Sequence, residues 1–256
     1  MAITPILLAQ LDVLWRNPVG DLALIRRHLV DVERDDQPLL VLPEMVSTGF
    51  TEDLDNLAEA PNGPWETSLT DALSVPTVLG IARRHADLTT NEAVYLRPGQ
   101  PEEFAYRKIR PFRSEHKVVT AGSEIITFDH QGVRFCPLIC YDLRFPELFR
   151  AGLCRGAEVF VVIASWPAPR QHHWELLLQA RAVENQAYVI GVNRCGNDPN
   201  FHYAGGSMVI NPHGDIIHHA GESESVTRIE IDPQMVRDWR AEFPGTKDYL
   251  ERPSLA

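Results

Sequence analysis

A cysteine stands where a predicted buried strand gives way to a helix, within the stretch RFCPLICYDLRFPELFR at residues 134–150. The apolar run from Phe135 to Ile139 predicts a strand that ends on Cys140, and Pro146 and Glu147 then begin an amphipathic helical pattern. Free backbone N–H groups at such a junction, together with the helix dipole, favour a thiolate and can bind a developing oxyanion. We therefore expect chemistry at Cys140 and expect the chain to be an enzyme.

Two further polar residues lie at the ends of predicted strands elsewhere in the chain. Glu44 follows LLVLP, and Lys108 ends EEFAYRK. Residues at strand ends cluster at one rim of a layered α/β fold, so the three side chains are expected to meet. Glu44 can then take the thiol proton of Cys140, and the thiolate can attack a carbonyl carbon. Lys108 and the backbone N–H of Tyr141 can hold the oxyanion, while Glu44 protonates the leaving nitrogen and activates water.

Each of these residues also has an ordinary structural interpretation. A single cysteine near a strand end is usually an inert core residue, Glu44 could cap a helix or pair with a cation, and Lys108 could be a solvated charge. The joint pattern is what favours catalysis. The remaining thiols carry no such pattern and are expected to be buried or partly buried: Cys136, Cys154 and Cys195.

The elements that must position these residues alternate between strands and helices. Apolar runs and turn residues predict strands over 3–14, 39–42, 91–96, 103–108, 125–128, 133–139, 158–165, 187–192, 207–211, 215–218 and 226–231. Helical spacing predicts helices from the Asn17 cap and Pro18 onward through Leu22, Ile25, Leu29 and Val32, and over 65–73, 171–186 and 233–241. Strands mixed with helices and several hairpins favour an α/β layered fold with mixed sheets.

Composition narrows the class of protein. The chain has 256 residues, 44% of them hydrophobic and 23% charged, which is typical of a globular protein, and with no linker or repeat we expect one domain over 1–256. A net charge of -11 argues against nucleic-acid and anionic-membrane partners.

The N-terminal MAITPILLAQLDVLW has no basic region and is interpreted as a strand, not a signal peptide. No cysteine pair has CxxC spacing, and a reduced, cytoplasmic setting is expected.

Cofactor and metal signals are absent from the sequence. Neither a GxGxxG nor a GxxxxGK loop occurs, so no nucleotide cofactor is implied. The pairs His172-His173 and His218-His219 place adjacent rings in different directions, with no carboxylate to complete a ligand pattern. We expect neither metal nor cofactor.

LPEMVSTGF around Glu44, YRK around Lys108 and LICYDLRFPE around Cys140 resemble the nitrilase superfamily, the carbon–nitrogen hydrolases. The stretch ASWPAPRQHHWELLLQARAVENQAYVIGVNRCGND and the later INPHGDII extend the resemblance through nearly the whole chain. The resemblance implies a four-layer α-β-β-α sandwich, commonly assembled as a homodimer or a higher homo-oligomer. It also implies a catalytic triad of Glu44, Lys108 and Cys140, with a second glutamate for which Glu115 in RSEHKVVTAG is the best match.

Within that superfamily the chain is most similar to the omega-amidase branch, because of ASWPAPR, the following HW and ARAVENQAYV. The branch implies hydrolysis of the terminal amide of 2-oxoglutaramate or 2-oxosuccinamate, with release of ammonia. One motif departs from the family. The frequent K-x-H-L-F is replaced by Lys108-Ile109-Arg110-Pro111-Phe112, in the segment that precedes Glu115.

Three residues near the nucleophile are candidates for substrate binding. Tyr141 supplies the backbone N–H next to Cys140, and Trp166 follows a predicted strand and could wall the pocket. Arg144 lies one turn beyond the nucleophile, where its guanidinium could hold a substrate carboxylate in bidentate fashion. Arg144 could equally pair with Asp142 or Glu147 in a structural ion pair.

Other functions fit parts of this pattern. An N-carbamoyl amide hydrolase would release carbon dioxide as well as ammonia, and a nitrilase proper would add water to a triple bond. A non-catalytic dimerising scaffold would keep the sandwich without the chemistry. The presence of all three proposed triad residues favours a thiol-dependent amidase that acts on a small carboxylate-bearing substrate.

Overall fold

The computed structural model describes residues 3–30, 35–100 and 104–251. Its strands are β1 (Thr4–Gln10), β2 (Leu39–Val41), β3 (Thr77–His85), β4 (Leu88–Leu96), β5 (Phe104–Arg107), β6 (Phe128–His130), β7 (Val133–Ile139), β8 (Val159–Ala164), β9 (Tyr188–Asn193), β10 (Cys195–Asn197), β11 (His202–Ala204), β12 (Met208–Ile210), β13 (Ile216–His219) and β14 (Ser225–Ile231). Its α-helices are α1 (Pro18–Leu29), α2 (Pro64–Thr70), α3 (Pro146–Cys154), α4 (Gln171–Asn185), α5 (Pro233–Glu242) and α6 (Gly245–Glu251). Three short 3-10 helices complete the described elements: η1 (Arg113–Lys117), η2 (Cys140–Arg144) and η3 (Ala168–Arg170).

Two six-stranded mixed sheets stack face to face. The first has the order β14-β1-β2-β3-β4-β5, and the second has the order β13-β12-β9-β8-β7-β6. In the first sheet β1, β2 and β3 run parallel, and in the second β7, β8 and β9 run parallel, while the flanking strands are antiparallel. Contacts between β3 and β8 and between β4 and β7 join the two sheets.

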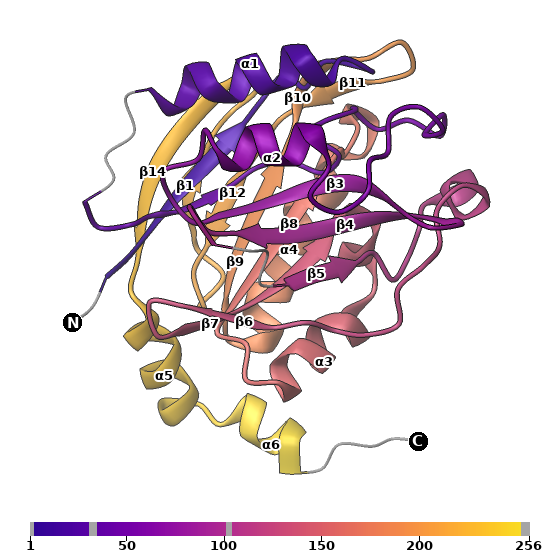
Figure 1. The fold of residues 1–256 in the computed structure, drawn as a ribbon. Helices are drawn as coiled ribbons and strands as arrows, with labels where there is room; N and C mark the ends of the chain where they lie inside the picture. Colours follow the sequence, from indigo (N-terminus) through magenta and orange to yellow (C-terminus); the bar gives the residue numbers. More distant parts are fainter. Residues whose placement is uncertain (1–2, 31–34, 101–103, 252–256) are drawn as a thin grey trace.

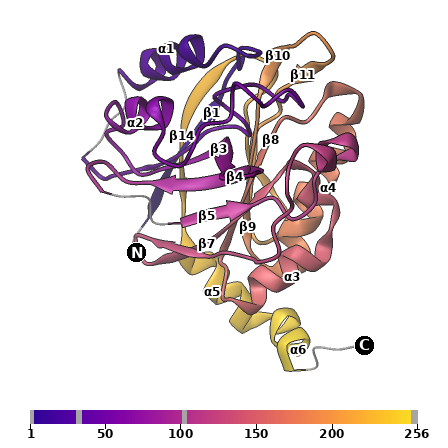
Figure 2. The same ribbon diagram turned by 45° about the vertical axis from the view of Figure 1, so that its right-hand side comes forward.

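Helices cover the outer face of each sheet, as Figures 1 and 2 show. Helices α1 and α2 lie over the first sheet, and α3 and α4 lie over the second. One apolar cluster fills the space between the sheets and continues under α3 and α4, and a second packs α1 and α2 on the first sheet. The expected four-layer α-β-β-α sandwich is therefore confirmed.

Local sequence explains where several elements begin. The side chain of Asn17 accepts a hydrogen bond from the backbone N–H of Gly20, and Pro18 follows as the first residue of α1. All six residues of β8 are buried, as expected for an uninterrupted apolar run covered on both faces. Within the described ranges, no helix is long and apolar enough to cross a membrane.

The structure corrects some predicted bounds. The strand predicted at 125–128 lies instead at Phe128–His130, because it pairs with the first residues of β7 across the turn that contains Gly132. The prediction at 103–108 becomes β5, and its first residue, Glu103, lies outside the described residues, as does Val32 at the end of the first helical pattern. The β10–β11 hairpin and helix α6 were not predicted, since β10 and β11 have three residues each and lack a long apolar run.

Candidate active site

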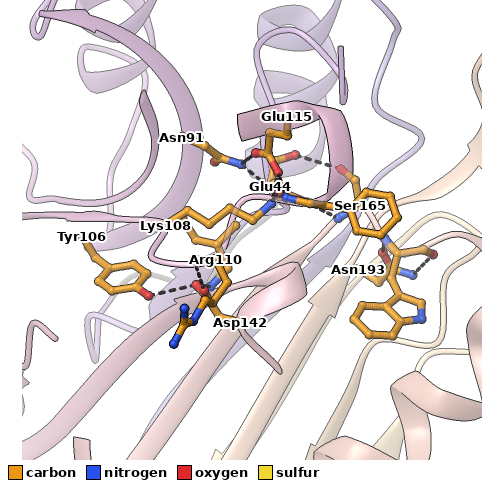
Figure 3. A network of polar contacts seen from close by, with 12 residues as sticks. Glu44, Asn91, Tyr106, Lys108, Arg110, Glu115, Asp142, Ser165 and Asn193 are labelled. Atoms are coloured by element: carbon orange, nitrogen blue, oxygen red, sulfur yellow. Dashed lines mark hydrogen bonds and ion pairs between the residues drawn. The ribbon is translucent and has the colours of Figure 1, made fainter. Parts of the chain in front are cut away.

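Four predicted side chains converge at the carboxyl ends of strands from both sheets. Glu44 lies in the turn after β2, Lys108 directly follows β5, and Cys140 begins η2 at the end of β7. Glu115 lies in η1, which is folded back over this edge. All four side chains are buried, with exposed fractions between 0% and 8%. Figure 3 shows Lys108 pointing between the two glutamates.

Lys108 is held between two carboxylates. Its Nζ lies 2.8 Å from Oε1 of Glu44 and 2.8 Å from Oε2 of Glu115. Burial alone would lower the pKa of Lys108, but the adjacent charges of Glu115 and Glu44 outweigh it and raise the pKa above its ordinary value. Lys108 is therefore an ammonium group at neutral pH, fixed in position and able to stabilise a nearby negative charge.

Two groups that were not predicted from sequence complete the surroundings of the glutamates. The Nδ2 of Asn91 donates to Glu44 Oε1 at 2.8 Å and to Glu115 Oε1 at 2.9 Å. The backbone N–H of Ser165 donates to Glu44 Oε2 at 2.8 Å. Each carboxylate is thus oriented by several donors. Asn91 begins NEAVYL beside the charged Glu92, and this local sequence did not mark it as part of the site.

The backbone around Glu44 needs a glycine on the neighbouring strand. A Cβ placed on Gly80 would lie 2.5 Å from the Cα of Glu44 and 2.8 Å from the N of Met45. Only a residue without a side chain lets β3 approach this turn so closely. Gly80 therefore helps to set the position of the Glu44 carboxylate.

Cys140 occupies a tight turn between β7 and η2. Its φ angle is 46°, in the left-handed region that non-glycine residues rarely adopt and that marks functional turns. Burial and then the charge of Glu44 raise the pKa of Cys140 well above its usual range, against the opposing effect of Lys108. Burial beside a carboxylate therefore outweighs the effect of the strand–helix junction, which by itself favours a thiolate. The thiol is the resting form, and Glu44 is positioned to remove its proton.

The remaining thiols differ in exposure. Cys136 and Cys195 are buried, as predicted, but Cys154 is exposed because it ends α3 at the surface. All four cysteines are free thiols.

Asp142 fixes the turn that carries Cys140. Its carboxylate accepts hydrogen bonds from the backbone N–H of Ile139 at 3.0 Å, the N–H of Arg110 at 2.9 Å and the hydroxyl of Tyr106 at 2.9 Å. Burial nevertheless raises the pKa of Asp142 to about 7. Asp142 therefore links β7, η2 and the segment after Lys108, including the Arg110 position at which the chain departs from the family motif (Figure 3).

A small hollow opens beside Cys140. Tyr141 and Trp166 line it, and four of its other lining residues are also aromatic: Phe50, Phe112, Phe201 and Tyr203. Trp166 is held by Asn193, whose side chain accepts from the Trp166 N–H at 2.7 Å and donates to the Trp166 carbonyl at 3.0 Å. The site is thus a small, mostly apolar pocket with the Cys140 thiol at its wall, which suits a small substrate.

Arg144 also lines this hollow, and its contacts bear on the structural ion pair that was one of its two interpretations. Asp142 is occupied by other donors, and Glu147 lies 3.4 Å from Arg110. Arg144 instead lies over the ring of Trp166, at 4.8 Å from the ring centroid, and its Nη2 is 3.2 Å from Nδ1 of His173. The structural ion pair with Asp142 or Glu147 is therefore not formed.

Known proteins are similar to this chain in sequence and in fold. A family model described as "Carbon-nitrogen hydrolase" matches residues 8–241. The chain is 36% identical to "Omega-amidase YafV" of Escherichia coli K12, over 95% of each chain, and 34% identical to "2-oxoglutaramate amidase" of Bacillus subtilis, over 93% of this chain and 95% of the relative. A solved structure of XC1258 from Xanthomonas campestris, described as a CN-hydrolase superfamily protein, superposes with a TM-score of 0.89 at 30% identity and covers 97% of both chains.

Proposed function

Because the chain belongs to the carbon–nitrogen hydrolase family, we propose that it is an omega-amidase, which hydrolyses the terminal amide of 2-oxoglutaramate or 2-oxosuccinamate. The observation that carries this proposal is the buried Glu44–Lys108–Glu115 group beside Cys140, since it contains a base, an oxyanion donor and a nucleophile. The names of the relatives from Escherichia coli and Bacillus subtilis support the substrate.

The first half of the reaction transfers the acyl group to sulfur. Glu44 takes the Cys140 thiol proton, and Sγ forms a bond to the amide carbonyl carbon. The resulting oxyanion is stabilised by Lys108 Nζ and the backbone N–H of Tyr141. Collapse of this intermediate breaks the C–N bond, Glu44 returns its proton to the nitrogen, and ammonia leaves.

The second half of the reaction releases the acid. Glu44, again a carboxylate, removes a proton from water, and the hydroxide attacks the thioester carbon. The same two donors hold the second oxyanion. Collapse breaks the C–S bond, the thiolate recovers the proton from Glu44, and a carboxylic acid leaves. Glu115 takes no proton in this scheme, and it positions Lys108 through their 2.8 Å contact.

The far end of the substrate is proposed to meet Arg144. This side chain lines the hollow, and its guanidinium can bind a carboxylate through two parallel hydrogen bonds. A small amide with a carboxylate at its other end would place the amide at Cys140 and the carboxylate at Arg144.

Ammonia release from 2-oxoglutaramate tests the function, in the wild type and in Cys140→Ala. We expect turnover that depends on Cys140, with the variant folded as judged by circular dichroism. Cys195→Ala is the matched control, because Cys195 is another buried free thiol and does not line the hollow. Activity retained in Cys140→Ala would refute the nucleophile.

The same assay separates the alternatives. Cys140-dependent carbon dioxide release from a carbamoyl compound would support an N-carbamoyl amide hydrolase, and turnover of a nitrile would support a nitrilase. A scaffold would show no activity and no cysteine that reacts with an alkylating agent much faster than the others.

The setting and assembly of the protein are also proposals. Free cysteines and the net charge of -11 support a reduced, cytoplasmic setting without nucleic-acid or membrane partners. We expect a homodimer or a higher homo-oligomer, as is common for proteins of this kind. Sedimentation velocity would measure the assembly, and a monomer at micromolar concentration would contradict it.

A further inference from the structure

The hollow beside Cys140 is lined by two arginines and, among the described residues, by no carboxylate side chain. One is Arg144, and the other is Arg170, the last residue of η3. The chain as a whole carries eleven more negative than positive charges. A pair of cations at the aromatic-walled hollow beside Cys140 is therefore a local reversal of charge, and it needs an explanation.

The fold holds both guanidinium groups against aromatic rings. Arg144 lies over Trp166, and Arg170 lies over Phe112 at 5.4 Å from the ring centroid. The indole Nε1 of Trp166 also donates to the carbonyl of Arg170 at 2.8 Å, which ties the backbone of η3 to the pocket wall. Stacking covers one face of a guanidinium and leaves its N–H donors available at the edge.

Neither side chain forms an ion pair with any carboxylate in the described part of the chain. Two buried arginines elsewhere do meet carboxylates: Arg83 meets Glu66 and Glu92, and Arg181 meets Glu184. Burial, followed by the positive charge of Arg144, lowers the pKa of Arg170. The pocket thus holds positive charge that the protein itself does not neutralise, which an incoming anion would stabilise.

We propose that Arg170 is a specificity-determining residue that forms, together with Arg144, a subsite for the acid end of the substrate, and that this subsite accepts anionic amides but excludes amino-acid amides. This inference rests on the proposed function and deepens it. An α-ammonium group would lie near two guanidinium groups and would meet no carboxylate partner. The rings of Phe112 and Trp166, which could otherwise bind an ammonium, are already covered by the arginines. A 2-oxo acid has the carboxylate without the ammonium.

Four amides of equal carbon-chain length test this subsite: 2-oxoglutaramate, glutaramate, glutamine and pentanamide. In the wild type we expect kcat/KM for glutaramate to exceed that for glutamine by at least about 100-fold, because like charges are placed together in the glutamine complex. Arg170→Gln should lower the glutaramate-to-pentanamide ratio of kcat/KM by about 10- to 100-fold, the effect of losing hydrogen bonds to a charged group. Arg170→Lys should retain part of the preference, since it keeps the charge but not the fork of donors.

Arg26→Gln is the matched control. Arg26 lies on α1, away from the hollow, and donates to the carbonyl of Ser68, so its replacement should leave all four ratios unchanged. Thermal melting and the alkylation rate of Cys140 check that Arg170→Gln keeps the fold and the nucleophile.

The outcomes separate this inference from the proposed function. An unchanged glutaramate-to-pentanamide ratio in Arg170→Gln, or equal loss on both substrates, would overturn the subsite and leave the omega-amidase proposal standing. If the wild type hydrolyses glutaramate but not 2-oxoglutaramate, the proposed substrate is wrong, and the charge selection is still measured on glutaramate. If the wild type prefers pentanamide or glutamine to glutaramate, the subsite is refuted.

Discussion

Replacing Lys108 by methionine should destabilise the protein as well as inactivate it. Methionine has a similar length but no charge, so the carboxylates of Glu44 and Glu115 would lose the ammonium that lies 2.8 Å from each. Asn91 would remain as a donor to both. Two buried carboxylates would then face each other across an apolar side chain.

The size of this effect follows from the burial of the three groups. Lys108, Glu44 and Glu115 have exposed fractions of 1%, 0% and 1%. Removing one partner from a buried ion pair costs about 3–5 kcal/mol, because the remaining charge stays out of water without a partner. In a chain of this size the corresponding fall in Tm is about 6–20 °C.

Urea and thermal unfolding at pH 7, followed by circular dichroism, measure this change. Lys117→Met is the matched control, because Lys117 lies at the exposed end of η1 and should change the free energy of unfolding by less than about 0.5 kcal/mol. Adding Glu115→Gln to Lys108→Met should recover at least about 1 kcal/mol, since one unpaired charge is removed. If Lys108→Met is as stable as the wild type, the ion pairs of Lys108 with Glu44 and Glu115 do not stabilise the folded protein.

Three other perturbations test separate parts of the structure. Burial raises the pKa of Asp21 to about 7, so the stability that this group contributes is complete below about pH 4 and is lost as the pH rises through 7. The difference in the free energy of unfolding between wild type and Asp21→Asn should change by up to about 4 kcal/mol over this range. A pH-independent difference in urea unfolding would contradict this expectation. Gly80→Ala should displace Glu44 and lower kcat by about 100-fold in a folded protein, and unchanged kcat would show that the turn adjusts. Tyr106→Phe should cost about 1.5–3 kcal/mol in urea unfolding, because Asp142 loses one of its donors, and a neutral result would show that this hydrogen bond is dispensable.

Long apolar runs made much of the fold predictable from sequence. The prediction at 133–139 matches β7, and the helix at 171–186 matches α4 to within one residue, because each has a clear hydrophobic period. Element ends that depend on pairing were less predictable. Strand β6 is placed by its partner β7 and not by its own residues, and the three-residue strands β10 and β11 carry no periodic signal.

The candidate site likewise contains residues that were predictable from sequence and residues that were not. Glu44, Lys108 and Cys140 each lie at the end of a predicted strand, so their positions at strand ends were visible in the sequence. The contacts of Asn91 reach Glu44 and Glu115, which lie 47 and 24 residues away along the chain. Asp142 accepts from Tyr106, which lies 36 residues away. No local sequence pattern reports such contacts. Arg170 also needed the structure, because only the fold brings η3 to the hollow beside Arg144. The raised pKa of the Cys140 thiol depends on burial and on Glu44, which a strand–helix junction alone does not reveal.

Rapid-quench mass spectrometry of the wild type mixed with 2-oxoglutaramate tests the central claim most directly. The account predicts that an acyl group appears on Cys140 during turnover as ammonia is released, and fragmentation of the peptide FCPLICYDLR distinguishes Cys140 from Cys136. No acyl group should appear on Cys136, Cys154 or Cys195. Ammonia release with no acyl group on Cys140 in the first turnover, or with the acyl group on a different cysteine, would contradict it.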